Sequence, residues 1–163
     1  MSHRFTLEAL KELIVARRDG AQCLQVCIEE SGDPALRAVL LAHQRDCALA
    51  LQELQSLFRL LGGNPDARAK EAAAAHRRAA DLRAALACNG DGFILEVCER
   101  GESRALEVYR NALDDPLPEL VRATVLRQFE DVMTNHDQIR ALRSRSRPCV
   151  PPGAGRSAQA GSL

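Results

Sequence analysis

Aromatic side chains are scarce in this chain of 163 residues: they make up 3% of the sequence, with one tyrosine and no tryptophan. Proteins that stack single-stranded bases or a flat cofactor use several aromatic platforms. Net charge is missing as well, because 22 lysine and arginine residues balance 22 aspartate and glutamate residues. A broad basic face that binds phosphate backbones is therefore not expected. Both absences argue against nucleic acid as a partner.

The chain also lacks a long apolar run. No segment approaches the ~20 apolar residues of a membrane-spanning helix, and the start of the chain, MSHRFTLEALKEL, has no apolar stretch of signal-peptide length. We therefore expect a cytoplasmic protein that does not associate with membranes. Of the six cysteines, none forms a CxxC pair, and four fall within helical patterns, where small buried thiols are expected rather than disulfides or a soft-metal site: Cys23, Cys27, Cys47 and Cys98.

Apolar residues recur at helical spacing in four long segments. The first is expected to begin at an N-cap, Thr6, and to end at Glu30, and the second begins at Asp33-Pro34, an N-cap followed by a first-turn proline. The third contains residues 94–113, and the last ends near Arg143. No alternating pattern of β-strands occurs, so these segments predict an antiparallel helical bundle.

An alanine-rich segment, residues 69–87, lies between the second and third of these segments and has Leu82 and Leu86 as its bulky side chains. About 19 residues at ~1.5 Å each span roughly 28 Å, which is enough to carry the chain along the bundle. Ferritin-like bundles join two helix pairs by such a crossover. The predicted fold is thus an all-α, ferritin-like antiparallel four-helix bundle with a short Ala-rich crossover helix over residues 1–145, followed by a disordered Pro/Gly/Ser/Ala-rich tail, residues 146–163.

The segment EVCERGESRALEVYRNAL, residues 96–113, places carboxylates on the apolar side of a helix. Glu102 falls within the apolar stripe and Glu99 on its border; the stripe itself consists of Ile94, Cys98, Ala105, Tyr109 and Ala112. A carboxylate that faces a helical core has to be paired, hydrogen-bonded, protonated or metal-bound. Any chemistry of this protein is expected at this position.

A metal ion is one partner that these carboxylates could have. His136 lies on the apolar side of the last helix, His43 lies toward the core side of the second, and His76 is expected on the inner side of the crossover. Glu99, Glu102, His136 and His43 are therefore the candidate ligands of an iron or manganese ion. A dinuclear carboxylate centre, however, needs Glu-x-x-His on two helices, and no histidine here has a glutamate three residues upstream.

Arg17 offers the second kind of partner, because it faces inward from the first helix and could neutralise Glu102. A buried network of arginine, glutamate and histidine would satisfy the carboxylate without any metal or cofactor. The sequence favours this structural interpretation over the metal site.

Several segments together resemble an uncharacterised, mostly proteobacterial family, which is catalogued as a domain of unknown function and placed among ferritin-like four-helix bundles. The resemblance is strongest in the ECERGE-like motif of EVCERGESRALEVYRNAL and in NHDQIRALR; it also covers LKELIVARRDG, DPALRAVL, LQELQSLFRLLGGNPD and the HRR of residues 76–78. This family implies the fold and no established activity.

The function expected from these observations is a structural or interaction role without enzymatic activity, with a second copy or another protein as the partner. The alternative is a metal-binding protein or an oxidoreductase that uses glutamate and histidine in the bundle core. Other catalytic routes have less support, because no nucleophile has a neighbouring base at a recognisable spacing.

Overall fold

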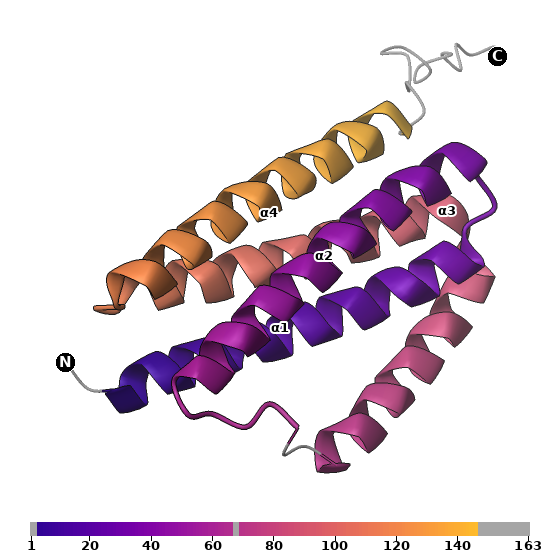
Figure 1. Cartoon of the computed structure of the whole chain (residues 1–163). Helices are drawn as coiled ribbons and strands as arrows, with labels where there is room; N and C mark the ends of the chain where they lie inside the picture. Colours follow the sequence, from indigo (N-terminus) through magenta and orange to yellow (C-terminus); the bar gives the residue numbers. More distant parts are fainter. Residues whose placement is uncertain (1–2, 67–68, 147–163) are drawn as a thin grey trace, which may run out of the picture.

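The computed structural model describes residues 3–66 and 69–146, and within these ranges every long element is a helix (Figure 1). The four helices are α1 (His3–Glu30), α2 (Pro34–Leu60), α3 (Ala69–Asp114) and α4 (Glu119–Ser146). The predicted all-α bundle is confirmed. The tail predicted for residues 146–163 lies almost entirely outside the described residues and stays a prediction.

Local sequence accounts for most of the helix ends. The carboxylate of Asp33 accepts a hydrogen bond of 2.9 Å from the backbone N–H of Ala35, so the predicted cap of α2 is confirmed. At the other end, Gly62 has a φ of 83°, which glycine adopts without strain, and it ends α2. The prediction that Thr6 caps α1 is wrong, because α1 begins at His3 and Thr6 is buried within the helix.

The helices form two antiparallel hairpins that are joined by a crossover (Figure 1). Helices α1 and α2 form one hairpin, and the second part of α3, residues 91–114, forms the other with α4. The first part of α3, residues 69–89, carries the chain from one end of the bundle to the other. Helix α1 packs against α2 and α3, and α3 packs against α4, whereas α2 and α4 contact each other little. The bundle is therefore open between α2 and α4.

The crossover and the core helix form one long element with a bend at Gly90, where φ is 71° and ψ is −173°. Only glycine adopts this conformation readily, so Gly90 marks the bend between the two parts of α3. Leu86 is buried and Leu82 packs against the same apolar cluster, which attaches the crossover to one end of the bundle. The earlier turns of the crossover diverge from α1 (Figure 1).

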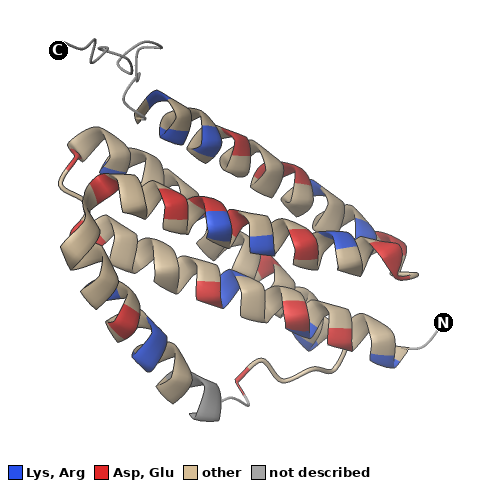
Figure 2. Ribbon diagram, turned by 180° about the vertical axis from the view of Figure 1, so that it is seen from behind, with Lys and Arg blue, Asp and Glu red and all other residues tan. Residues whose placement is uncertain are grey.

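Two apolar clusters, one toward each end of the bundle, make up the core. One contains Leu10, Leu54 and Val125, and the other contains Leu40 and Ile94. Buried polar side chains interrupt this core: Arg17 lies between the two clusters along α1, His43 lies among residues of the second cluster, and Gln128 lies between Val125 and Val132 of the first. Charged side chains of both signs alternate along the outer faces of the helices (Figure 2). None of the helices in the described ranges combines the length and the hydropathy that a bilayer crossing requires.

Candidate functional site

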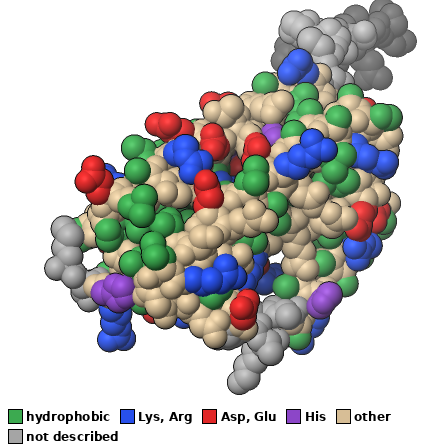
Figure 3. Space-filling model, viewed as in Figure 1, with side chains coloured by type: hydrophobic (Ala, Val, Ile, Leu, Met, Phe, Trp, Pro, Cys, Tyr) green, Lys and Arg blue, Asp and Glu red, His purple; other side chains and the backbone are tan. Residues whose placement is uncertain are grey.

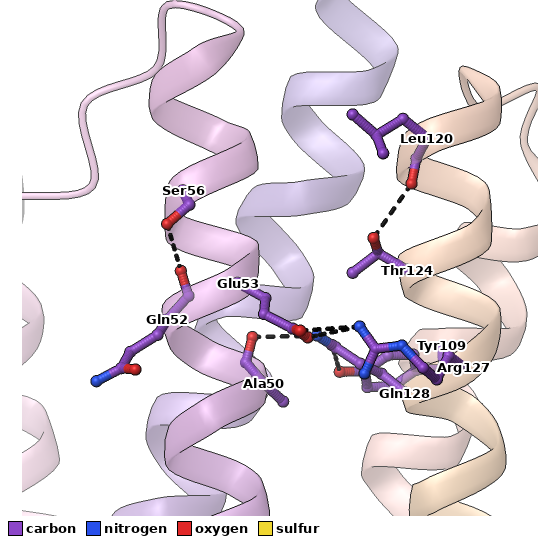
Figure 4. A network of polar contacts seen from close by, with 9 residues as sticks. All are labelled: Ala50, Gln52, Glu53, Ser56, Tyr109, Leu120, Thr124, Arg127 and Gln128. Carbon is purple, nitrogen blue, oxygen red and sulfur yellow. Dashed lines mark hydrogen bonds and ion pairs between the residues drawn. The ribbon is translucent and has the colours of Figure 1, made fainter.

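A hydrogen-bonded chain of buried side chains connects all four helices at the middle of the bundle. Arg17 of α1 donates its Nε–H to the Tyr109 hydroxyl of α3 at 2.8 Å, and Tyr109 donates to Gln128 Oε1 of α4 at 2.7 Å. Gln128 Nε2 in turn donates to two acceptors on α2, the backbone carbonyl of Ala50 at 3.2 Å and Glu53 Oε2 at 2.7 Å (Figure 4). Every buried polar atom of this hydrogen-bonded network thus has a partner.

Arg17 is buried, as the sequence predicted, with 5% of its surface exposed. Its Nε–H, however, contacts Tyr109, and among the described contacts it forms no ion pair with Glu102. The guanidinium also lies 5.0 Å from the centre of the Tyr109 ring. The partner of Arg17 is therefore Tyr109, whereas the sequence predicted Glu102.

Glu102 and His43 form a second buried polar pair next to this chain. Glu102 Oε1 lies 4.0 Å from His43 Nδ1, and the two side chains are 11% and 2% exposed. His43 Nε2 lies 2.8 Å from Gln138 Oε1, while the buried Nδ1 has no hydrogen-bond partner among the described residues. The Nδ1 of His43 thus faces the Glu102 carboxylate at a distance too long for a hydrogen bond.

The environment of Glu102 disfavours its charged form. Burial raises the pKa of Glu102 from its ordinary value of 4.5 to about 7; the nearby Arg17 opposes this increase, and Asp46 adds to it. A carboxyl group with this pKa is about half protonated at neutral pH. It can then act as a hydrogen-bond donor or as an acceptor.

The structure separates the four candidate metal ligands into two places. Glu102 and His43 come together, whereas Glu99 lies 2.6 Å from Arg143 Nη1 and 3.6 Å from Arg140 Nε. The hydrogen bond from Arg143 lowers the pKa of Glu99, so this carboxylate is a partner of arginines. Within the described ranges, no group of three or more His, Cys, Asp and Glu side chains is arranged to hold a metal ion.

His136, the fourth candidate, lies on the α3–α4 side of the bundle, where its Nε2 is 2.9 Å from Ser103 Oγ. Its Nδ1 is 3.8 Å from the exposed carboxylate of Asp137, which is longer than a hydrogen bond, so that carboxylate does not orient the imidazole as a general base. The prediction that His76 points inward is wrong, since His76 is exposed on the crossover.

The four cysteines expected in the core are free thiols, of which three are buried and Cys23 is partly buried. A hydrogen bond with Cys27 raises the pKa of Cys23, and burial raises that of Cys47. Cys23 and Cys47 line a cavity of about 30 Å³ together with Cys98 and Glu102. Thiols with raised pKa values are poor nucleophiles, which agrees with the expectation of packing residues.

A groove of about 570 Å³ lies between α2 and α4, and we name it the α2–α4 groove. Acidic and hydrophobic side chains gather on this face (Figure 3), and a pair formed by Glu53 and Arg127 spans it at 2.9 Å (Figure 4). The groove is lined by Asp46, Leu49, Ala50, Gln52, Glu53, Ser56, Leu57, Thr124, Arg127, Gln128 and Asp131.

Gln128 is not among the residues predicted from the sequence, although the sequence contains a signal for it. Gln128 and Asn135 occupy the three- and four-residue spacing of the buried Val121, Val125, Val132 and Ile139 on α4, and both are buried. A polar residue at a core position of such a stripe predicts a buried hydrogen bond. No comparable pattern in the sequence predicts the groove, because the groove depends on which helices are neighbours in the bundle.

Comparisons with known proteins agree with this fold. The family described as "Domain of unknown function (DUF2383)" matches residues 6–115. No curated protein matches the chain. Among solved structures, the chain is similar to a two-domain protein from Anabaena variabilis with DJ-1/ThiJ/PfpI-like and ferritin-like domains, at a TM-score of 0.74 and 11% identity. The alignment covers 97% of this chain and 42% of that chain, so this chain spans less than half the length of the neighbour.

At this identity the likeness concerns the fold alone, and it confirms the prediction of a ferritin-like bundle. The family match covers well over half of the residues, including nearly all of α1 and the whole of α2 and α3. This chain therefore belongs to the family described as "Domain of unknown function (DUF2383)" and has a ferritin-like fold.

Proposed function

We propose that this bundle is a non-enzymatic interaction protein of the cytoplasm, which binds a partner protein in the α2–α4 groove. The observation that supports this proposal is the groove itself, because three of the exposed large hydrophobic residues border it or continue its walls by one helical turn. Leu49 lines the groove and is 61% exposed; Leu60 follows Ser56 by one turn and is 73% exposed; Leu120 precedes Thr124 by one turn and is 62% exposed. Exposed leucines that cluster along a groove are typical of protein interfaces.

The buried network supports the same proposal, because it fixes the floor of the groove. Gln128 binds both the Ala50 carbonyl and Glu53, so α2 and α4 are held at a defined distance although they pack together little. A rigid, preformed groove lowers the entropic cost of binding a partner.

Matched leucine substitutions test this proposal in cells that naturally produce the protein. We expect the wild-type protein to co-purify with the same proteins as a Leu126→Ser control, since Leu126 is an exposed leucine of α4 outside the groove lining. Leu49→Ser should lose at least one of these proteins. Identical sets of co-purifying proteins for all three would contradict the proposal.

A second candidate function is the binding of an iron or manganese ion at Glu102 and His43, with Glu99 and His136 as the remaining ligands proposed from the sequence. The observation that favours it is the buried, unpartnered Nδ1 of His43 at 4.0 Å from Glu102 Oε1. Imidazole nitrogen and carboxylate oxygen both suit these metals. Glu99 and His136 would have to leave Arg143 and Ser103 to join them.

The metal content of the purified protein decides this second candidate. Cells supplemented with iron and manganese should yield wild-type protein with near-stoichiometric metal, and Glu102→Ala should lose it while Glu107→Ala, an exposed glutamate of α3, retains it. Metal-free wild-type protein would contradict metal binding and leave the interaction proposal unaffected.

A further inference from the structure

The groove has an excess of acidic side chains, and this excess defines the chemistry of its occupant. Its lining contains Asp46, Glu53 and Asp131 but a single basic residue, Arg127. Arg127 is engaged with both carboxylate oxygens of Glu53 at 2.9 Å, and Gln128 donates a further hydrogen bond to the same group. The charge of Glu53 is therefore compensated within the protein.

Asp46 and Asp131 remain as the uncompensated charges of the groove. Both are exposed, one on α2 and one on α4, and no ion pair of either appears among the described residues. Two carboxylates on opposite walls attract a ligand with positive charge on both of its sides.

The apolar part of the groove lies next to these carboxylates. Leu57 is buried at the floor and Leu49 projects from the wall of α2, while Leu120 projects from α4 toward α2 (Figure 4). An occupant has to present apolar side chains to this surface and positive charges to Asp46 and Asp131. Both requirements are met by an amphipathic helix with leucine-like residues on one stripe and lysine or arginine beside it.

The length of the groove also suits a helix. Its lining on α2 runs from Asp46 to Leu57, which corresponds to about 17 Å of helix, or roughly three turns of an occupant. A helix placed there would lie along α2 and α4, over the Glu53–Arg127 ion pair, where these two helices contact each other little.

A second copy of this chain fits the groove less well. Two copies that meet through the same face, about a two-fold axis parallel to the groove, would bring Asp46 and Asp131 of one close to those of the other. Like charges at an interface oppose association unless they find partners.

We propose that the α2–α4 groove binds a cationic amphipathic helix of about three turns, whose apolar stripe covers Leu49 and Leu57 and whose basic residues pair with Asp46 and Asp131. This inference rests on the proposed interaction function and adds the chemical class of the partner.

Fluorescence anisotropy with the full chain tests this proposal. The probe is a labelled, amidated peptide of about 14 residues with leucine and lysine at helical spacing, and the control peptide has glutamate in place of every lysine. We expect saturable binding of the lysine peptide and none of the glutamate peptide at equal concentration. The double variant Asp46→Asn/Asp131→Asn should weaken the binding about three- to tenfold, as expected for two partly exposed charge pairs.

Matched controls separate the groove from general attraction to acidic surface. Glu130→Gln and Leu126→Ser, at exposed positions of α4 outside the groove lining, should leave the affinity unchanged, whereas Leu49→Ser should weaken it about tenfold. Circular dichroism of each variant verifies that the bundle is folded.

Three results would overturn the inference: equal binding of both peptides, equal loss in the groove and control variants, or no effect of Asp46→Asn/Asp131→Asn. A dimer in sedimentation that Leu49→Ser dissociates would assign the groove to a second copy instead. If co-purification depends on Leu49 while the lysine peptide does not bind, the interaction function stands and its cationic specificity fails.

Discussion

Tyr109 shows how much one hydroxyl group contributes to this bundle. It accepts a hydrogen bond from Arg17 and donates one to Gln128, and all three side chains are buried. Removing the hydroxyl leaves a buried guanidinium N–H and an amide oxygen without partners, which is more costly than the loss of an exposed hydrogen bond.

Tyr109→Phe is therefore expected to lower the free energy of unfolding by about 1–3 kcal/mol, measured by urea denaturation. The ring remains, so the apolar contribution is preserved. As a control, Thr134→Val removes an exposed hydroxyl that bonds Glu130 O at 3.1 Å, and it should change stability by less than about 0.5 kcal/mol. Equal effects of both substitutions would contradict the role of the buried network.

Glu102 makes stability depend on pH, with Arg17, Asp46 and His43 as the charged or titratable groups around it. Its pKa is raised in the folded protein, so the native state retains a proton that the unfolded chain releases from about pH 4.5 upward. Stability from this group is thus complete below pH 4.5, falls as the pH rises toward about 7, and is constant above that value. The full change corresponds to roughly 3 kcal/mol.

Glu102→Gln should remove this dependence, because an amide does not titrate. We expect the variant to approach wild-type stability at pH 5 and to exceed it at pH 8, as measured by urea unfolding at both values. A stability difference that is the same at both pH values would show that Glu102 is not protonated by burial.

At the scale of elements, the long α3 depends on the backbone of Gly90. Its φ of 71° and ψ of −173° lie in a region that side chains oppose, and this bend directs the crossover to the end of α1. Gly92, two residues later, has no atom within 4 Å of the position that a Cβ would occupy and is not in the left-handed region. The two glycines therefore form a natural pair for comparison.

Gly90→Ala should destabilise the protein by about 1–3 kcal/mol, while Gly92→Ala should stabilise it by up to about 1 kcal/mol because alanine favours the helix. Thermal or urea unfolding of both variants measures these changes. If Gly90→Ala were as stable as Gly92→Ala, the bend would not be a requirement of the fold.

The sequence predicts the elements of this fold better than its polar contacts. Helical spacing of apolar residues and the Asp33 cap indicated the bundle, and the alanine-rich segment indicated its crossover, because these signals are local. The hydrogen bonds of Arg17 with Tyr109 and of Glu99 with Arg143 join different helices. They depend on how neighbouring helices are rotated and shifted along their axes. Spacing along one helix does not contain this information.

At the scale of the whole molecule, the groove follows from the order in which the helices pack. Helix α1 packs against α2 and α3, and α4 packs against α3, so the contact between α4 and α2 that would close the bundle is largely missing. The network through Gln128 joins the two helices at the floor, the Glu53–Arg127 ion pair crosses the groove, and a volume of about 570 Å³ remains between the helices. Acidic walls and exposed leucines at this edge are the basis of the proposed interaction function.

Site-specific photocrosslinking in cells that naturally produce the protein tests whether the α2–α4 groove binds a partner protein. A benzophenone amino acid replaces Gln52, which lines the groove, or Glu107, which is exposed on α3 outside it. We expect discrete crosslinked products with another protein from position 52 and none of these products from position 107. Crosslinks of the same pattern from both positions, or none from position 52, would contradict a docking function of the α2–α4 groove.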